Sequence, residues 1–117
     1  MNEGEAKGKM TDNDKVPELT NEEFEDFAKE GIVLVDFFAE WCMPCLMMSP
    51  IIDELSEKFK GKIKFGKVNV EDNQELAQKF NVNSIPNIMI FKDGEVAENF
   101  TGAMSAEDLE EKLNNYL

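Results

Sequence analysis

The run IVLVDFF at residues 32–38 is apolar at every position except Asp36. Such a run is typical of a strand that is covered on both faces, as at the centre of a parallel sheet. A sheet of this kind has helices on each side, because a bare face would leave apolar side chains in water. With 117 residues, the chain is long enough for one domain with a single core. The run therefore predicts an α/β domain.

Helical and strand-like patterns alternate along the rest of the chain. Thr20 and Glu23 have the spacing of a capping box, and the helix that they begin should end near Gly31. Residues 46–59 have helical spacing around Pro50, which should kink the helix. The other expected elements are strands at 15–18, 62–70, 87–91 and 95–100, a short helix capped by Asp72 and Glu75, and a last helix capped by Ser105 with Leu109 and Leu113 inside.

The order of these elements predicts the layout of the sheet. Three strand–helix pairs are followed by two strands joined at Asp93 and Gly94, a dipeptide typical of a hairpin turn, and then by the last helix. Pro17 should confine the first strand to a sheet edge. We therefore expect one domain over residues 15–117, with a central mixed sheet and helices on both faces. Residues 1–14 are polar with alternating charges, so we expect a flexible N-terminal tail.

The charge and hydropathy of the chain exclude several classes of function. The net charge is -13, so bulk attraction to nucleic acid or to an anionic membrane is excluded. No segment approaches the roughly 20 apolar residues of a membrane-spanning helix. The N-terminal residues lack the apolar stretch of a secretory signal, so we expect a cytoplasmic protein. In that compartment a pair of cysteines is rarely a structural crosslink.

The only two cysteines, Cys42 and Cys45, lie in the segment EWCMPC between the apolar strand and a helix. Sites in α/β domains form at this end of a strand, and a helix N-terminus favours an anion such as the thiolate of Cys42. Cys45 follows almost one turn later, so its sulfur can reach Cys42. The closed loop would be short, adds little stability, and is suited to opening and closing. Pro44 restricts the turn, and Trp41 supplies an apolar wall beside it.

Two cysteines at this spacing could instead supply half of the ligands of a zinc site. Zinc sites usually need four ligands, and the chain has no other cysteine and no histidine. We therefore expect no metal site within one chain, whereas a site shared between two chains stays open.

Three segments together resemble the thioredoxin family. They are VDFFAEWCMPC with a proline five residues after the second cysteine, SIPNIMIFKDGE, and FTGAMSAEDL, in a match that covers about residues 15–117. The resemblance implies the thioredoxin fold and a protein-disulfide reductase of cell redox homeostasis and electron transport. It implies that the protein binds no cofactor and acts as a monomer. Its substrates would be protein disulfides, and an external thioredoxin reductase would recycle the Cys42–Cys45 disulfide.

The same resemblance assigns roles to residues around the thiols. Cys42 would be the attacking nucleophile, and Cys45 the buried thiol that resolves the mixed disulfide. Pro86 would follow a cis peptide bond and face the disulfide. The backbone of Ile85 would pair with a bound substrate segment, and Gly102 either lets the substrate backbone approach or is a simple turn glycine.

Asp36 is the polar exception within the apolar strand. An ionised carboxylate is costly in such a place, so its pKa should rise. It is either a hydrogen-bonded polar anchor or, by the resemblance, the proton acceptor for Cys45. Lys67 lies on a neighbouring expected strand, where it either pairs with Asp36 or extends into solvent.

Apolar side chains from three loops should surround the thiols. We expect Trp41, Met43, Ile85 and Ala103 to form an apolar collar that docks substrates, with the acidic charge lying mainly elsewhere. Met43 replaces a glycine that is usual in the family. Leu46 replaces an often basic residue, which removes one source of thiolate stabilisation. Two other classes remain open: a binding module in which the cysteines matter little, and an iron–sulfur or zinc site that bridges two chains.

Overall fold

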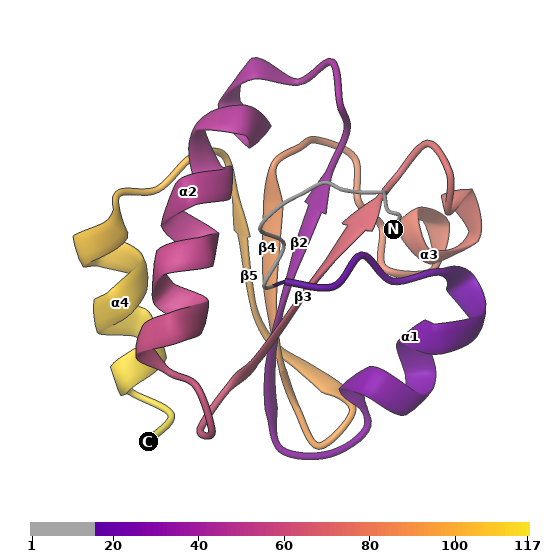
Figure 1. Cartoon of the computed structure of the whole chain (residues 1–117). Helices are drawn as coiled ribbons and strands as arrows, with labels where there is room; N and C mark the ends of the chain where they lie inside the picture. The colour runs from indigo at the N-terminus through magenta and orange to yellow at the C-terminus, as the bar shows by residue number, and fades with distance from the viewer. Residues whose placement is uncertain (1–15) are drawn as a thin grey trace, which may run out of the picture.

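The structure, a computed structural model, describes residues 16–117, which form a four-stranded mixed sheet between two layers of helices (Figure 1). The strand order is β3-β2-β4-β5. Central strand β2 pairs in parallel with β3 and antiparallel with β4, and β4 pairs antiparallel with β5. The predicted mixed sheet is confirmed. The strands are β2 (Ile32–Phe38), β3 (Lys64–Asn69), β4 (Asn87–Lys92) and β5 (Glu95–Thr101).

Two helices cover each face of the sheet, as predicted. In Figure 1, α2 and α4 lie on one side, and α1 and α3 lie on the other. Each layer has its own buried apolar cluster, so β2 is covered on both faces as its uninterrupted apolar run requires. Within residues 16–117 no helix is long and apolar enough to cross a membrane. The helices are α1 (Asn21–Ala28), α2 (Met43–Lys58), α3 (Gln74–Lys79) and α4 (Ala106–Asn114).

Within the described residues, the predicted first strand forms only one isolated β-bridge. Glu18 pairs with Lys67 at the outer edge of β3. The backbone N–H of Leu19 donates to the Lys67 carbonyl at 2.8 Å, and the Lys67 N–H donates to the Pro17 carbonyl at 2.9 Å. Pro17 lacks an N–H, so an edge position suits it. Lys15 and the predicted tail over residues 1–14 lie outside the described residues.

Local capping and turn signals are confirmed at three places. The Thr20–Glu23 capping box begins α1, and the Ser105 hydroxyl accepts a hydrogen bond from the Asp108 N–H at the start of α4. Asp93 and Gly94 both have positive φ, 52° and 90°, as the hairpin turn between β4 and β5 requires.

One predicted helix cap is wrong. The N-cap of α3 is Asn73 and not Asp72. The Asn73 side chain makes no cap bond; instead it accepts from the backbone N–H of Asn21 and donates to the carbonyl of Asn69. It thereby ties α1 to the end of β3, a contact between distant segments that a local capping pattern cannot predict. Helix α2 begins at Met43, directly after Cys42, so the predicted helix N-terminus at the first cysteine is confirmed, and Pro50 lies inside the helix.

The strand directions bring several loops to one edge of the sheet. Parallel strands β2 and β3 both end there, antiparallel β4 begins there, and β5 ends there. The register pairs Phe37 with Asn87, Asn87 with Thr101, and Phe38 with Asn69. The segments after β2, β3 and β5 and before β4 therefore meet at one end of the domain.

Candidate active site

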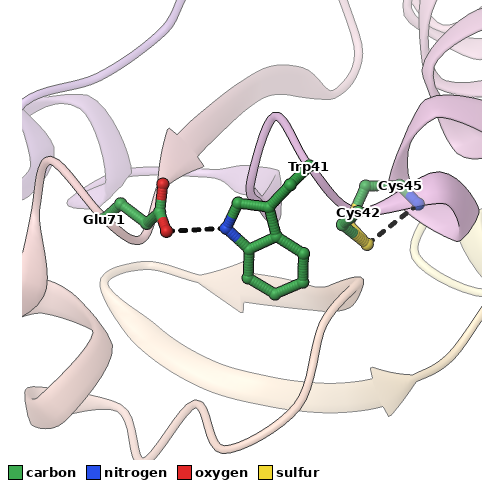
Figure 2. Close-up of a disulfide and its surroundings, with 4 residues drawn as sticks. All are labelled: Trp41, Cys42, Cys45 and Glu71. Atoms are coloured by element: carbon green, nitrogen blue, oxygen red, sulfur yellow. Dashed lines mark hydrogen bonds between the residues drawn. A yellow bond between two sulfur atoms is a disulfide. The ribbon is translucent and has the colours of Figure 1, made fainter.

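Cys42 and Cys45 form a disulfide at the start of α2, at this end of the sheet. Cys42 is the N-cap residue, and its Sγ accepts a hydrogen bond from the Cys45 backbone N–H at 3.2 Å (Figure 2). Cys42 therefore occupies the place where a side-chain oxygen usually satisfies an unpaired helix donor. Pro44 lies in the first turn, where its missing N–H leaves no helix bond unmade.

The helix N-terminus gives the Cys42 sulfur a positive electrostatic environment. Unpaired N–H groups and the helix dipole place partial positive charge there. The first turn of α2 contains no acidic residue that would offset this charge. When the disulfide is reduced, the thiolate of Cys42 is the anion that this environment favours.

Exposure does not distinguish the two cysteines, but their surroundings do. Cys42 is 4% exposed and Cys45 is 3% exposed. Only Cys45 lines a cavity of about 170 Å³ whose other walls include Asp36, Leu46 and Lys67. Cys45 therefore lines the same small cavity as two acidic residues, Asp36 and Glu40.

Asp36 is buried, and its Oδ1 has no hydrogen-bond partner. Burial raises the pKa of this carboxyl from 3.8 to about 7, because desolvation disfavours its charged form; the positive charge of Lys67 opposes the rise. Lys67 is the register partner of Asp36 across β2 and β3 and lines the same cavity. The predicted rise in pKa is confirmed, and the unbonded oxygen argues against a hydrogen-bonded anchor.

Glu71 is a site residue that the sequence patterns did not single out. The Trp41 indole Nε1–H donates to Glu71 Oε2 at 2.6 Å, and Figure 2 shows the indole between Glu71 and the cysteines. Trp41 is 66% exposed, so this bond orients a side chain that lies mostly in solvent. Glu71 is thus one acidic side chain beside the collar, whereas we expect the acidic charge to lie mainly elsewhere. Its position in the sequence could have identified it as a site residue, because Glu71 follows β3 and the end of β3 lies beside the end of β2.

The loop before β4 also contacts the cysteines. The Ile85–Pro86 peptide bond is cis, as predicted. The Ile85 side chain packs against the buried group that contains both cysteines. Strand pairing of β4 begins only at Asn87, so the backbone of Ile85 lies just before the ladder.

The loop after β5 adjoins Pro86. The Gly102 N–H donates to the Pro86 carbonyl at 2.8 Å. Gly102 has a φ of 91°, which favours glycine, and a Cβ atom added there would meet nothing within 4 Å. Ala103, the next residue, is exposed. The collar residues thus come from three loops at the same edge of the sheet.

Within residues 16–117, no three histidine, cysteine, aspartate or glutamate side chains are grouped in a way that could hold a metal ion. The described site brings together two sulfurs that can interchange between dithiol and disulfide and a carboxyl whose pKa is about 7.

Comparisons with known proteins agree with this geometry. The family model described as Thioredoxin matches residues 15–115. A thioredoxin from Bacillus subtilis (strain 168) is 41% identical over 102 residues, which cover 87% of this chain and 98% of the relative. One from Listeria monocytogenes is 42% identical over 102 residues, covering 87% and 99%. One from Porphyra purpurea is 45% identical over 85 residues, covering 73% and 79%.

Proposed function

Since the chain belongs to the thioredoxin family and is a protein thiol–disulfide oxidoreductase, we propose that it works mainly as a reductase of protein disulfides. One observation carries the proposal: the Cys42–Cys45 disulfide lies at a helix N-terminus, with the buried carboxyl of Asp36 beside Cys45.

The reaction would proceed in two exchanges. The Cys42 thiolate attacks one sulfur of the substrate disulfide, forms a mixed disulfide, and releases the first substrate thiolate. Asp36 accepts the proton of Cys45, and the Cys45 thiolate attacks Cys42 Sγ. This step closes the Cys42–Cys45 disulfide and releases the second substrate thiolate. The substrate gains two electrons from the two cysteine sulfurs. One of its two protons comes from Cys45 by way of Asp36, and the other comes from the solvent, which took up the Cys42 proton when the thiolate formed.

The surrounding loops would hold the substrate in place. An extended substrate segment would pair with the backbone at Ile85 beside Pro86, as a strand adds to a sheet edge. Gly102 and Ala103 leave open space next to Pro86 for such a segment.

The remaining site residues would support the thiols. Pro44 limits the separation of the sulfurs, Trp41 and Met43 provide the apolar collar, and Lys67 tunes the charge of Asp36.

We also propose an electron donor, a compartment and an oligomeric state for the protein. An external thioredoxin reductase would supply two electrons to the Cys42–Cys45 disulfide after each turnover. The protein would act as a cytoplasmic monomer in electron transport and redox homeostasis. Residues 15–117 would form one domain.

Equilibration with glutathione and dithiothreitol redox buffers tests the direction of the reaction. We expect a reduction potential below roughly −230 mV, in the range of dithiols that reduce other disulfides. Leu46 provides no positive charge near the thiols, so the reduced form gains less stabilisation than in strong oxidants. The fraction of disulfide is read from alkylated thiols by mass spectrometry. A potential near roughly −120 mV would instead identify a disulfide-forming enzyme.

The collar makes a separate prediction for substrate binding. Trp41→Ala or Met43→Asp should raise the KM for a protein disulfide such as insulin by about tenfold, because each removes apolar contact area. The KM for the small reagent dithiobis(nitrobenzoate) should change much less. Steady-state kinetics on both substrates gives the comparison. Equal losses on the two substrates would mean that the thiols themselves are perturbed, and the collar would have to be abandoned.

A further inference from the structure

The loop between β5 and α4 is held at three points. The Gly102 N–H donates to the Pro86 carbonyl at 2.8 Å, and Ser105 is the N-cap of α4. Between these two points, the Met104 backbone N–H donates to the sulfur of Met48 on α2, with an N–Sδ distance of 3.3 Å. In Figure 1 the loop passes beside α2 on its way from β5 to α4. The Met48 sulfur therefore ties this loop to the helix that begins at the disulfide.

Met48 is a hydrogen-bond acceptor within the core of the domain. Its side chain is fully buried, and it follows Cys45 by three residues on the same helix. A thioether sulfur is a weak acceptor. Within residues 16–117, however, the Met104 N–H has no other acceptor. Without the sulfur, this part-buried donor would be unpaired unless the loop moved to expose it to water.

Apolar packing alone would not hold the loop in the same way. Met104 also packs against the apolar cluster that contains Met48. Apolar contacts are non-directional, so a leucine of similar volume would satisfy them about equally well. A hydrogen bond instead sets the position of a backbone atom, and Ala103 lies between two such bonds, those of Gly102 and Met104. The sulfur thus adds a positional constraint that a purely apolar side chain cannot supply.

We propose that Met48 is a positioning residue for protein substrates. Its sulfur holds the Met104 N–H and thereby keeps the backbone of residues 102–103 in place next to Pro86. This inference rests on the proposed function, since it takes an extended substrate segment to bind beside Pro86. Met48 itself is buried and does not touch the substrate, so a small disulfide reagent that needs only the thiols should not depend on it.

Replacement of Met48 by leucine tests the proposal. Leucine fills a similar volume but has no acceptor, so the Met104 N–H loses its bond. The KM for insulin should rise about fivefold, which is the size of effect that one net hydrogen bond supplies, while kcat for insulin stays unchanged. Both constants for dithiobis(nitrobenzoate) should stay unchanged. Met48→Ile also lacks an acceptor and should give the same pattern.

Leu55→Met is the matched control, because it is the reverse exchange in the same apolar cluster. Leu55 is also buried on α2, and its side chain has no hydrogen-bonding atom, so this variant changes the packing and keeps the loop bond. Its KM for insulin should equal that of the wild type. Amide hydrogen exchange, measured by NMR, gives an independent readout. Exchange of the Met104 N–H should be about tenfold faster in Met48→Leu and unchanged in Leu55→Met.

The possible outcomes separate this inference from the proposed function. If the wild-type protein does not reduce insulin, the proposed function fails and the inference falls with it. If the wild type reduces insulin but Met48→Leu leaves the KM unchanged, or raises it equally for both substrates, only the inference is overturned. It is also overturned if Leu55→Met raises the KM as much, because altered packing would then explain the effect. Exchange of the Met104 N–H at the wild-type rate in Met48→Leu would overturn it as well.

Discussion

In a Cys45→Ser variant, turnover of a protein disulfide should fall by roughly a thousandfold or more, and Cys42 should remain linked to the substrate. Cys42 keeps its place at the N-terminus of α2, so the first attack still occurs. The second attack is lost, because serine cannot form a disulfide with the Cys42 sulfur. The mixed disulfide should therefore accumulate.

Non-reducing electrophoresis and mass spectrometry after incubation with insulin would detect this species. Cys42→Ser is the matched control, with equal loss of turnover and no linked substrate. If Cys42→Ser traps substrates and Cys45→Ser does not, the roles of the two cysteines are reversed. If partner binding survives Cys42→Ser and accounts for the biological activity, the chain works as a binding module.

Replacing Asp36 with asparagine should slow turnover by about a hundredfold at pH 8, since it removes the proton acceptor for Cys45. Asparagine has nearly the same shape and cannot take up the proton. With a pKa of about 7, Asp36 is ionised only above neutral pH, so the wild-type rate should rise between pH 6 and pH 8. In Asp36→Asn this rise should disappear.

Single-turnover reduction of insulin across this pH range measures both effects. The first exchange, observed as mixed-disulfide formation in the Cys45→Ser background, should be much less sensitive to Asp36→Asn. A wild-type rate that stays constant from pH 6 to pH 8 would refute the role of Asp36.

The same substitution should stabilise the folded protein at high pH. Below pH 3.8 the Asp36 carboxyl is protonated in both the folded and the unfolded chain, so its ionisation has no effect on stability. Between pH 3.8 and about 7 the unfolded chain loses the proton and the folded chain keeps it, so the free energy of unfolding falls as pH rises. Above about pH 7 the loss is complete and amounts to about 4 kcal/mol.

Urea unfolding of the oxidised protein tests this linkage. Asp36→Asn should raise the free energy of unfolding by up to about 4 kcal/mol at pH 8 and by little at pH 4. A variant that is less stable than the wild type at pH 8 would show that Asp36 has a stabilising partner in the folded state.

Local patterns predicted much of the fold, because they act within a few residues. The apolar run at 32–38 identified the covered strand β2, and the Thr20–Glu23 box and Ser105 marked helix starts. The Asp93–Gly94 turn located the hairpin. The position of the cysteines between a buried strand and a helix placed Cys42 at a helix N-terminus, which its N-cap geometry confirms.

Only the structure showed which of Met47 and Met48 is buried. Their spacing indicated a helix, but it left open which one packs inside. Met48 is buried in the apolar cluster that α2 and α4 form against the sheet, whereas Met47 is exposed on α2. The difference depends on the direction from which the sheet meets the helix, which is a property of the whole domain.

The surroundings of the thiols were likewise decided by tertiary structure. Strand pairing across β2 and β3 places Lys67 beside Asp36, and the packing of α2 on the sheet brings Asp36 and Cys45 to the walls of one cavity. The bond from Trp41 to Glu71 joins residues 30 positions apart. No local pattern specifies such contacts, because they form only when parallel strands bring their carboxyl ends to the same edge of the sheet. The sequence by itself determined where the thiols lie and what reaction they perform; the tertiary structure decided which acidic residues line a cavity with Cys45 and which carboxylate accepts the hydrogen bond from Trp41.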